Sequence, residues 1–203
     1  FCATGAIGHK RNMTADEITD QILYFYLAGH QINSVSFMGM GEPFANPNLF
    51  DALKILTNPS LFGLSQRRIT ISTIGMIPGI KRLTRDFPQV NLAFSLHSPF
   101  EKQRSELMPI NQTYPLHKVM DALDAHVANT KRRLFLAYIM LGGINDSAEH
   151  AKALAHLILS RGALSYLYHV DLIPYNATDK TARKFTASNH EAIKNFSDIL
   201  HSN

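Results

Sequence analysis

The sequence predicts an α/β fold in which helices cover a parallel sheet. Five short apolar segments alternate along the chain with stretches of helical periodicity. The apolar segments are almost continuously hydrophobic, which is typical of strands in a parallel sheet. This alternation indicates either a barrel or an open, doubly wound sheet. The expected strands span residues 34–38, 68–72, 90–95, 134–140 and 167–173.

A helix is expected before the first strand, from residue 14 to residue 29. Thr14 and Glu17 have the spacing of a capping box, and Gly29 follows the last apolar residue of the helical pattern. A further helix is expected after each strand, because apolar residues recur there at helical intervals. These helices are expected around residues 50–56, 78–85, 114–129, 147–160 and 188–200.

The composition is that of a single globular domain spanning residues 1–203. The chain is 45% hydrophobic and 18% charged, and no linker-like stretch interrupts the alternation. No apolar run is long enough to cross a bilayer, and a single cysteine excludes an internal disulfide. We therefore expect no membrane association and a reducing, cytoplasmic location.

Basic residues exceed acidic residues by 20 to 16, which gives a net charge of +4. Short basic runs occur at residues 10–11, 67–68, 131–133 and 183–184. Such runs can neutralise the phosphates of a nucleic acid, but they are also typical of an ordinary solvated surface. The sequence leaves both interpretations open.

Chemistry is expected beyond the carboxyl ends of the strands, where parallel α/β folds gather their reactive groups. Small, hydroxyl-bearing and amide residues follow the strands there, and they suit a ligand with an amine, a carboxylate and ribose hydroxyls. Glu42 fits an ammonium group, although it could equally complement a helix dipole. His97 could be a general base or a cofactor contact, or a structural hydrogen-bonding residue. The strand-end segments are 38–43, 72–75, 95–98 and 173–176.

The single cysteine, Cys2, has two interpretations. A lone cysteine near a chain end is usually an inert thiol, and a metal site needs three or four ligands. The histidines form no pair spaced to bind a metal on one helix face, since His150 and His156 are six residues apart. From the residues alone, no complete metal site is predicted.

Several motifs in a fixed order resemble one known family. The chain resembles the radical S-adenosylmethionine (radical SAM) 23S rRNA adenine methyltransferases over essentially its whole length. It is more similar to the branch that methylates C8 of the adenine, and confers antibiotic resistance, than to the branch that methylates C2. The motifs are Phe-Cys-Ala-Thr-Gly at 1–5, Met-Gly-Met-Gly-Glu-Pro at 38–43, Arg-Arg-x-x-x-Ser-Thr at 67–73, Ser-Leu-His at 95–97 and Met-Pro-Ile-Asn at 108–111.

The resemblance implies a fold and a set of ligands. The fold would be an incomplete (β/α)6 radical SAM barrel that lacks its first strand and its C-terminal segment. Cys2 would be the third cysteine of the family's Cys-x-x-x-Cys-x-x-Cys loop, which binds a [4Fe-4S] cluster. Gly41 and Glu42 would receive the amino group of S-adenosylmethionine. The further cofactor contacts would be Ser72, Ser95, Leu96, His97 and Asn176.

The resemblance also implies a reaction and its partners. In the family, one cofactor molecule methylates a cysteine near the C-terminus, and a second is cleaved reductively to a deoxyadenosyl radical. The methylated cysteine then loses a hydrogen atom and adds to the adenine. The substrate would be 23S rRNA, and the enzyme would be a monomer with a reductant such as flavodoxin.

The sequence departs from the family pattern in its cysteines. Cys2 has no partner cysteine, and the methyl-accepting cysteine would lie beyond Asn203. We therefore expect residues 1–203 to be the core domain of a longer enzyme, without its N-terminal accessory domain and its C-terminal segment. Such a chain would hold no catalytic residue of its own and would be inactive alone.

Three alternatives remain at this stage. The parent enzyme could methylate C2 of the same adenine. The chain could instead be a remnant that binds S-adenosylmethionine or RNA without catalysis. It could also be an unrelated barrel enzyme acting on a phosphorylated metabolite, for which residues 141–143 offer only a weak phosphate-binding loop.

Overall fold

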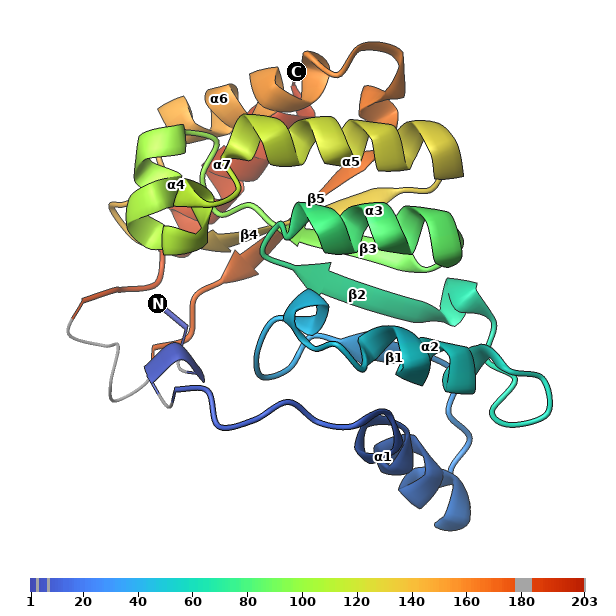
Figure 1. Ribbon diagram of the computed structural model, residues 1–203. Coiled ribbons are helices and arrows are strands. Elements are labelled where there is room, and N and C mark those ends of the chain that lie inside the picture. Colours follow the sequence, from blue (N-terminus) through green and yellow to red (C-terminus); the bar gives the residue numbers. More distant parts are fainter. Residues whose placement is uncertain (3, 7, 178–183, 203) are drawn as a thin grey trace.

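The computed structural model describes residues 1–2, 4–6, 8–177 and 184–202. Its centre is a five-stranded parallel sheet whose strands follow the order of the sequence (Figure 1). The predicted α/β class is confirmed, and all five strands lie within one residue of their predicted boundaries. The strands are β1 (Val35–Phe37), β2 (Ile69–Thr73), β3 (Asn91–Ser95), β4 (Leu134–Met140) and β5 (Tyr168–Pro174).

The described part of the chain contains seven α-helices. Six of them match the predicted helices, and α4 is additional. None of the described helices is long and apolar enough to cross a membrane. The helices are α1 (Ala15–Leu27), α2 (Leu49–Thr57), α3 (Ile77–Asp86), α4 (Glu101–Leu107), α5 (Leu116–Thr130), α6 (Ala148–Leu159) and α7 (His190–His201).

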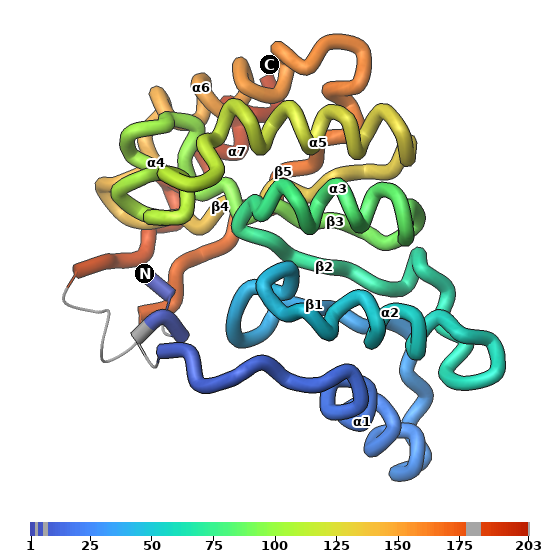
Figure 2. The backbone as a smooth tube through the Cα atoms, in the orientation of Figure 1, coloured from blue at the N-terminus to red at the C-terminus, as the bar shows by residue number. Residues whose placement is uncertain are grey.

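The helices that connect the strands lie on one face of the sheet. Each strand pairs with its neighbours in sequence, so right-handed crossovers all place their helices on the same side. Figure 2 shows α2, α3 and α5 following one another along that side. This winding is that of a barrel wall. A doubly wound sheet would carry helices on both faces.

Burial alternates along the strands in agreement with this arrangement. In β4, Leu136 and Tyr138 are fully buried beneath the helices, whereas Ala137 and Ile139 on the other face are half-buried. In β2 and β3 the corresponding half-buried positions include Ser72 and Ser95. On the face without helices, β2 and β3 therefore present short and polar side chains near their carboxyl ends.

The first helix begins as the capping box predicted. The Thr14 hydroxyl accepts the Glu17 N–H at 3.2 Å, and the Glu17 carboxylate accepts the Thr14 N–H at 2.9 Å. Arg11 donates two hydrogen bonds of 2.7 Å to the same carboxylate. The side chain of Glu17 thus fixes the chain that enters α1.

The unpredicted helix α4 connects to the start of α5 through Glu101. The Glu101 carboxylate accepts the N–H groups of Leu116 and His117 at 3.1 and 2.9 Å. It also accepts the side-chain amide of Asn111 at 2.8 Å. A negative charge at a helix N-terminus is favourable because the first N–H groups have no partner within the helix. Glu101 therefore joins α4 and α5 into one unit above the ends of β2 and β3.

Candidate functional site

A cleft of about 630 Å³ lies at the carboxyl ends of β1, β2 and β3. It is bounded by the N-terminal residues, the loop after β1 and the segment 107–110, which begins at the last residue of α4. A cavity of this volume is in the range of sites for small-molecule ligands. Its position is the one expected for the reactive end of a parallel sheet.

Most of the predicted site residues are brought together in this cleft. Leu96 is not in its lining because its side chain is fully buried in the core. Asn176 is exposed after β5 and does not line the cleft either. The predicted residues that do line it are Cys2, Gly41, Glu42, Ser72, Ser95 and His97.

Glu42 is held between two segments of the chain. Its Oε1 accepts the Thr73 hydroxyl at 2.7 Å and the Phe44 N–H at 3.2 Å, and its Oε2 accepts the Ile74 N–H at 2.9 Å. The Phe44 bond caps the 3-10 helix Pro43–Ala45, so the helix-terminus interpretation of Glu42 is correct in part. Thr73, which orients the carboxylate, was not singled out from the sequence.

The Glu42 carboxylate can accept another donor. Two carboxylate oxygens offer about four acceptor positions, and three are used by described residues. Burial raises the pKa of Glu42, while the three hydrogen bonds oppose this rise. A cation in the cleft would offset the cost of burying the negative charge. The position therefore fits the ammonium group of a ligand as well as the capping role.

Ser72, Ser95 and Gly41 present groups to the same cleft. Among the described residues, neither serine hydroxyl has a hydrogen-bond partner, so both can bond to a ligand. Gly41 has a φ of 96°, a left-handed conformation that glycine adopts without the penalty of a side chain. Nothing lies within 4 Å of a Cβ placed on Gly41, so a ligand can approach its backbone closely.

His97 forms part of the cleft wall and is a structural hydrogen-bonding residue. Its Nδ1 accepts the Ile139 N–H at 3.0 Å, which leaves the proton of the neutral ring on Nε2. Burial lowers the pKa of His97 to about 3, with a smaller contribution from the charge of Arg104. The Phe1 ring meets it edge-on, with centroids 5.1 Å apart. A neutral ring with Nδ1 already bonded does not suit a general base at neutral pH.

Asn145 positions His97 and was missed from the sequence. Its fully buried amide donates to the carbonyl oxygens of His97 and Ile139 at 2.8 and 2.7 Å, and its Oδ1 accepts the Leu141 N–H at 2.8 Å. The His97 backbone has a φ of 58°, which is uncommon for a residue other than glycine. Asn145 thus stabilises a strained residue at the cleft wall.

Arg104, like Thr73 and Asn145, was missed from the sequence. It is fully buried on α4 and donates to the carbonyl oxygens of Ile74, Ser95 and Leu96 at 2.9, 3.1 and 3.1 Å. Its Nη1 also donates to Asn111 Oδ1 at 2.6 Å. Burial lowers its pKa to about 10, so it stays protonated at neutral pH. One guanidinium therefore fixes the ends of β2 and β3 beneath the cleft.

Cys2 lies at the cleft and is exposed. Burial raises the pKa of its thiol, but hydrogen bonds from the backbone of Gly5 and Thr4 and from the Thr4 side chain outweigh it, and the pKa is lowered overall. A lowered pKa favours the thiolate, the form that binds metals. Among the described residues, however, no group of three or more His, Cys, Asp or Glu residues could hold a metal ion. The described residues supply one cysteine and do not make a cluster site by themselves.

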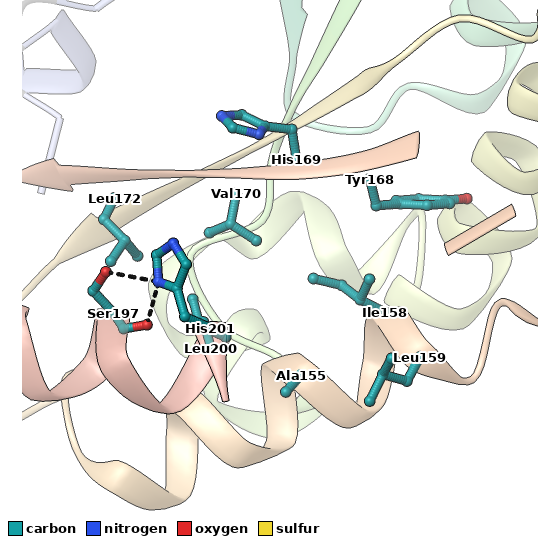
Figure 3. Close-up of a pocket in the computed structure, with 10 residues that line it drawn as sticks. All are labelled: Ala155, Ile158, Leu159, Tyr168, His169, Val170, Leu172, Ser197, Leu200 and His201. Atoms are coloured by element: carbon teal, nitrogen blue, oxygen red, sulfur yellow. Dashed lines mark hydrogen bonds between the residues drawn. The ribbon is translucent and has the colours of Figure 1, made fainter. Parts of the chain in front are cut away.

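A second hollow of about 390 Å³ lies between β5, α6 and α7 (Figure 3). Its walls are mainly apolar side chains such as Ile158, Val170 and Leu172. His201 is bonded through Nδ1 to the Ser197 carbonyl oxygen at 2.8 Å. None of the predicted site residues lies there, and it contains no carboxylate. It is therefore not the candidate site.

Two buried histidines make the fold sensitive to acid. Burial lowers the pKa of His97 to about 3 and that of His126 to about 4, against about 6.5 in an unfolded chain. Below pH 6.5 the unfolded chain binds more protons than the folded chain, so stability falls as the pH falls toward 4. We expect the free energy of unfolding to be about 3 kcal/mol lower at pH 5.5 than at pH 7.5.

Urea denaturation at the two pH values measures this loss. His126→Gln should reduce it by about half, whereas His30→Gln, which changes an exposed histidine, should leave it unchanged. Equal stability of the unsubstituted chain at both pH values would contradict the prediction.

Comparisons with known proteins identify the family and the fold of the chain. The family model described as the radical SAM superfamily matches residues 1–158. The chain is 73% identical over its whole length to "Ribosomal RNA large subunit methyltransferase Cfr" of Lachnoclostridium phytofermentans, of which it covers 59%. It is 55% identical over its whole length to the protein of the same name from Staphylococcus warneri and covers 58% of it. The chain thus spans somewhat more than half the length of the curated relatives it matches.

Two solved structures have the same fold. A radical SAM methyltransferase from Sphaerobacter thermophilus matches with a TM-score of 0.91 and 40% identity, covering all of this chain and 59% of the other. A domain of pyruvate-formate lyase-activating enzyme from Bacteroides vulgatus matches with a TM-score of 0.60 and 18% identity. It covers 84% of this chain and 94% of that domain, and it supports the fold alone.

Proposed function

The chain belongs to the radical SAM superfamily, and from this premise we propose that it is the core domain of an enzyme that methylates C8 of an adenine in 23S rRNA. The modification would give resistance to antibiotics that act on the ribosome. The observation that carries the proposal is the 73% identity, over the whole chain, to a protein named as a ribosomal RNA methyltransferase. The substrate, a reductant such as flavodoxin, a monomeric state and a cytoplasmic location belong to the same proposal.

The cleft residues fit S-adenosylmethionine, which when bound supplies the methyl group. Glu42 would accept the methionine ammonium at its remaining acceptor position. The hydroxyls of Ser72 and Ser95 would bond to the carboxylate or the ribose. His97 would hold the wall of the cleft in place and offer Nε2–H as a donor. Arg104 would keep the two serine-bearing strand ends at a fixed separation.

The remaining predicted residues have less support from the geometry. Cys2 would be one thiolate ligand of a [4Fe-4S] cluster, and the described residues supply no others. Leu96 would act through its backbone, since its side chain is buried. Asn176 would reach a ligand only from the segment after β5. No step of the reaction is assigned to these three residues.

Glu42→Gln tests the cofactor site. Glutamine keeps the acceptor oxygen for Thr73 and Phe44, but it removes the negative charge that the ammonium would meet and the oxygen that accepts the Ile74 N–H. A charge-assisted hydrogen bond contributes about 1.5 to 3 kcal/mol, so we expect the affinity for S-adenosylhomocysteine to fall about 10- to 100-fold. Isothermal titration calorimetry measures it, and Glu106→Gln, at an exposed site on α4, is the control. Unchanged affinity in Glu42→Gln would refute the assignment.

Analysis of the reaction product is needed to determine which carbon of the adenine is methylated. Expression of the complete reading frame that contains this chain, followed by mass spectrometry of 23S rRNA, distinguishes 8-methyladenine from 2-methyladenine. A C8 mark that disappears in Cys2→Ala supports the proposal. A C2 mark, or no mark, contradicts it.

A further inference from the structure

Five basic residues gather at the end of the sheet opposite to the cleft. Arg67 and Arg68 directly precede β2, and Lys131, Arg132 and Arg133 directly precede β4. β3 lies between these strands and pairs with both, so the two runs are about 10 Å apart across the sheet. Because all strands are parallel, the five side chains share the amino-terminal edge. We refer to them as the amino-end cluster.

The arginines of this cluster donate hydrogen bonds to uncharged groups. Arg67 Nε donates to Gln89 Oε1 at 3.0 Å, and Arg132 Nη2 donates to Asn91 Oδ1. Arg68 Nη1 donates to the backbone and side-chain oxygens of Asn33 at 3.2 and 3.3 Å. Amide oxygens orient the guanidinium groups but leave their charges uncompensated.

The amino-end cluster differs in this respect from other cations of the chain. Among the described residues, no member of the cluster has a carboxylate within ion-pair distance. The cations that do have such a carboxylate lie elsewhere on the surface, and they are Arg11, Lys54, Arg82, Arg85 and Arg161. The cluster therefore brings together five positive charges that no carboxylate of the described residues balances.

Arg132 shows that the cluster lacks an acceptor. Its Nε is buried and has no hydrogen-bond partner among the described residues. Burial lowers its pKa, and the charge of Arg67 lowers it further, so the two guanidinium groups repel each other. A buried donor without an acceptor costs free energy, and so does the repulsion. An anion beside Arg67 and Arg132 would relieve the repulsion between the two guanidinium groups.

We propose that the amino-end cluster binds the phosphate backbone of the RNA substrate. The inference rests on the proposed function, since it takes RNA as the substrate. Phosphates are anions with several acceptor oxygens, and guanidinium groups bind them in a paired geometry. β4 has seven residues, so the cluster lies about 20 Å from the cleft. Contacts at that distance would position a large RNA around the domain without reading its bases.

The test uses two exposed members of the cluster that make no hydrogen bond through their side chains to described residues. Lys131→Gln/Arg133→Gln removes two charges, and Lys118→Gln/Lys152→Gln removes two charges from exposed sites on α5 and α6 as the matched control. Fluorescence anisotropy with a fluorescein-labelled RNA hairpin measures affinity from 50 to 300 mM KCl. Circular dichroism melting checks that both variants are folded.

We expect Lys131→Gln/Arg133→Gln to weaken RNA binding about 10- to 50-fold at 0.1 M salt and the control about twofold or less. The slope of log K against log salt should become shallower by about 2 in the first variant only. Arg67→Gln/Arg132→Gln, which removes the pair of guanidinium groups that repel each other, should show the same loss.

The outcomes separate this inference from the cofactor assignment. Glu42→Gln should bind the hairpin as well as the unsubstituted chain does. Equal losses in the cluster variant and the control, or no loss in either, would overturn the inference. A chain that binds S-adenosylhomocysteine but not the hairpin would also overturn it while leaving the cofactor site intact.

Discussion

Replacing Arg104 by methionine is expected to lower the free energy of unfolding by about 3 to 5 kcal/mol. Methionine fills a similar volume but donates no hydrogen bond. The carbonyl oxygens of Ile74, Ser95 and Leu96 would lose their guanidinium donor, and Asn111 would lose a bond of 2.6 Å. The relief from removing a buried charge offsets only part of this loss, because each buried acceptor without a partner costs about 1 to 3 kcal/mol.

Urea denaturation at pH 7.5 measures the effect. Lys102→Met, at an exposed site on the same helix, should change the free energy of unfolding by about 0.5 kcal/mol or less. Arg104→Lys should lie between the two, because an ammonium group cannot reach four acceptors in the geometry of a planar guanidinium. A change below about 1 kcal/mol in Arg104→Met would show that the strand ends do not depend on this residue.

Gly79→Ala is expected to destabilise the protein by about 2 to 3 kcal/mol, although alanine normally stabilises a helix by about 1 kcal/mol relative to glycine. Gly79 lies in the first turn of α3 against the ring of Phe44. A Cβ at position 79 would lie 2.2 Å from Phe44 Cγ and 2.5 Å from Phe44 Cβ. These atoms are near the backbone and cannot move aside without shifting the 3-10 helix that Glu42 caps. The substitution should therefore weaken cofactor binding as well as stability.

Thermal denaturation and a double substitution check this prediction. Gly39→Ala, where nothing lies within 4 Å of the added Cβ, is the control for stability and should have little effect. Phe44→Ala removes the ring, which includes the nearest atom Cγ, and leaves only the contact of 2.5 Å with the Phe44 Cβ. If the clash is the cause, Gly79→Ala should cost less in the Phe44→Ala background than in the unsubstituted chain. Equal costs in both backgrounds would exclude this cause.

The strands were predictable because each buried strand is a short, nearly continuous run of apolar residues in the sequence. Residues 134–140 form an apolar run rich in large side chains, and the observed strand has the same boundaries. Helix α4 was not predictable in this way. Its sequence, Glu-Lys-Gln-Arg-Ser-Glu-Leu, has no apolar period, and the residue that it buries is an arginine. A periodicity argument assigns such a segment to the surface.

The site was predictable only in part, because only some of its residues are marked by a local sequence pattern. Glu42, Ser72 and Ser95 could be placed because strand ends in a parallel sheet converge on one edge. Arg104 and Asn145 could not, since their roles depend on carbonyl groups that come close only in the folded chain. The sequence position of a buried donor does not indicate which acceptors it will meet.

The sequential order of the strands has a consequence for how the chain folds during its synthesis. Each strand from β2 to β5 pairs with the strand made just before it. A growing chain can therefore add one strand and helix at a time to the sheet that has already left the ribosome. None of these pairings, from β1 with β2 onward, requires a strand from a distant part of the sequence. The exposed edge moves from strand to strand as synthesis proceeds, and at each stage it is the binding surface for the strand that emerges next.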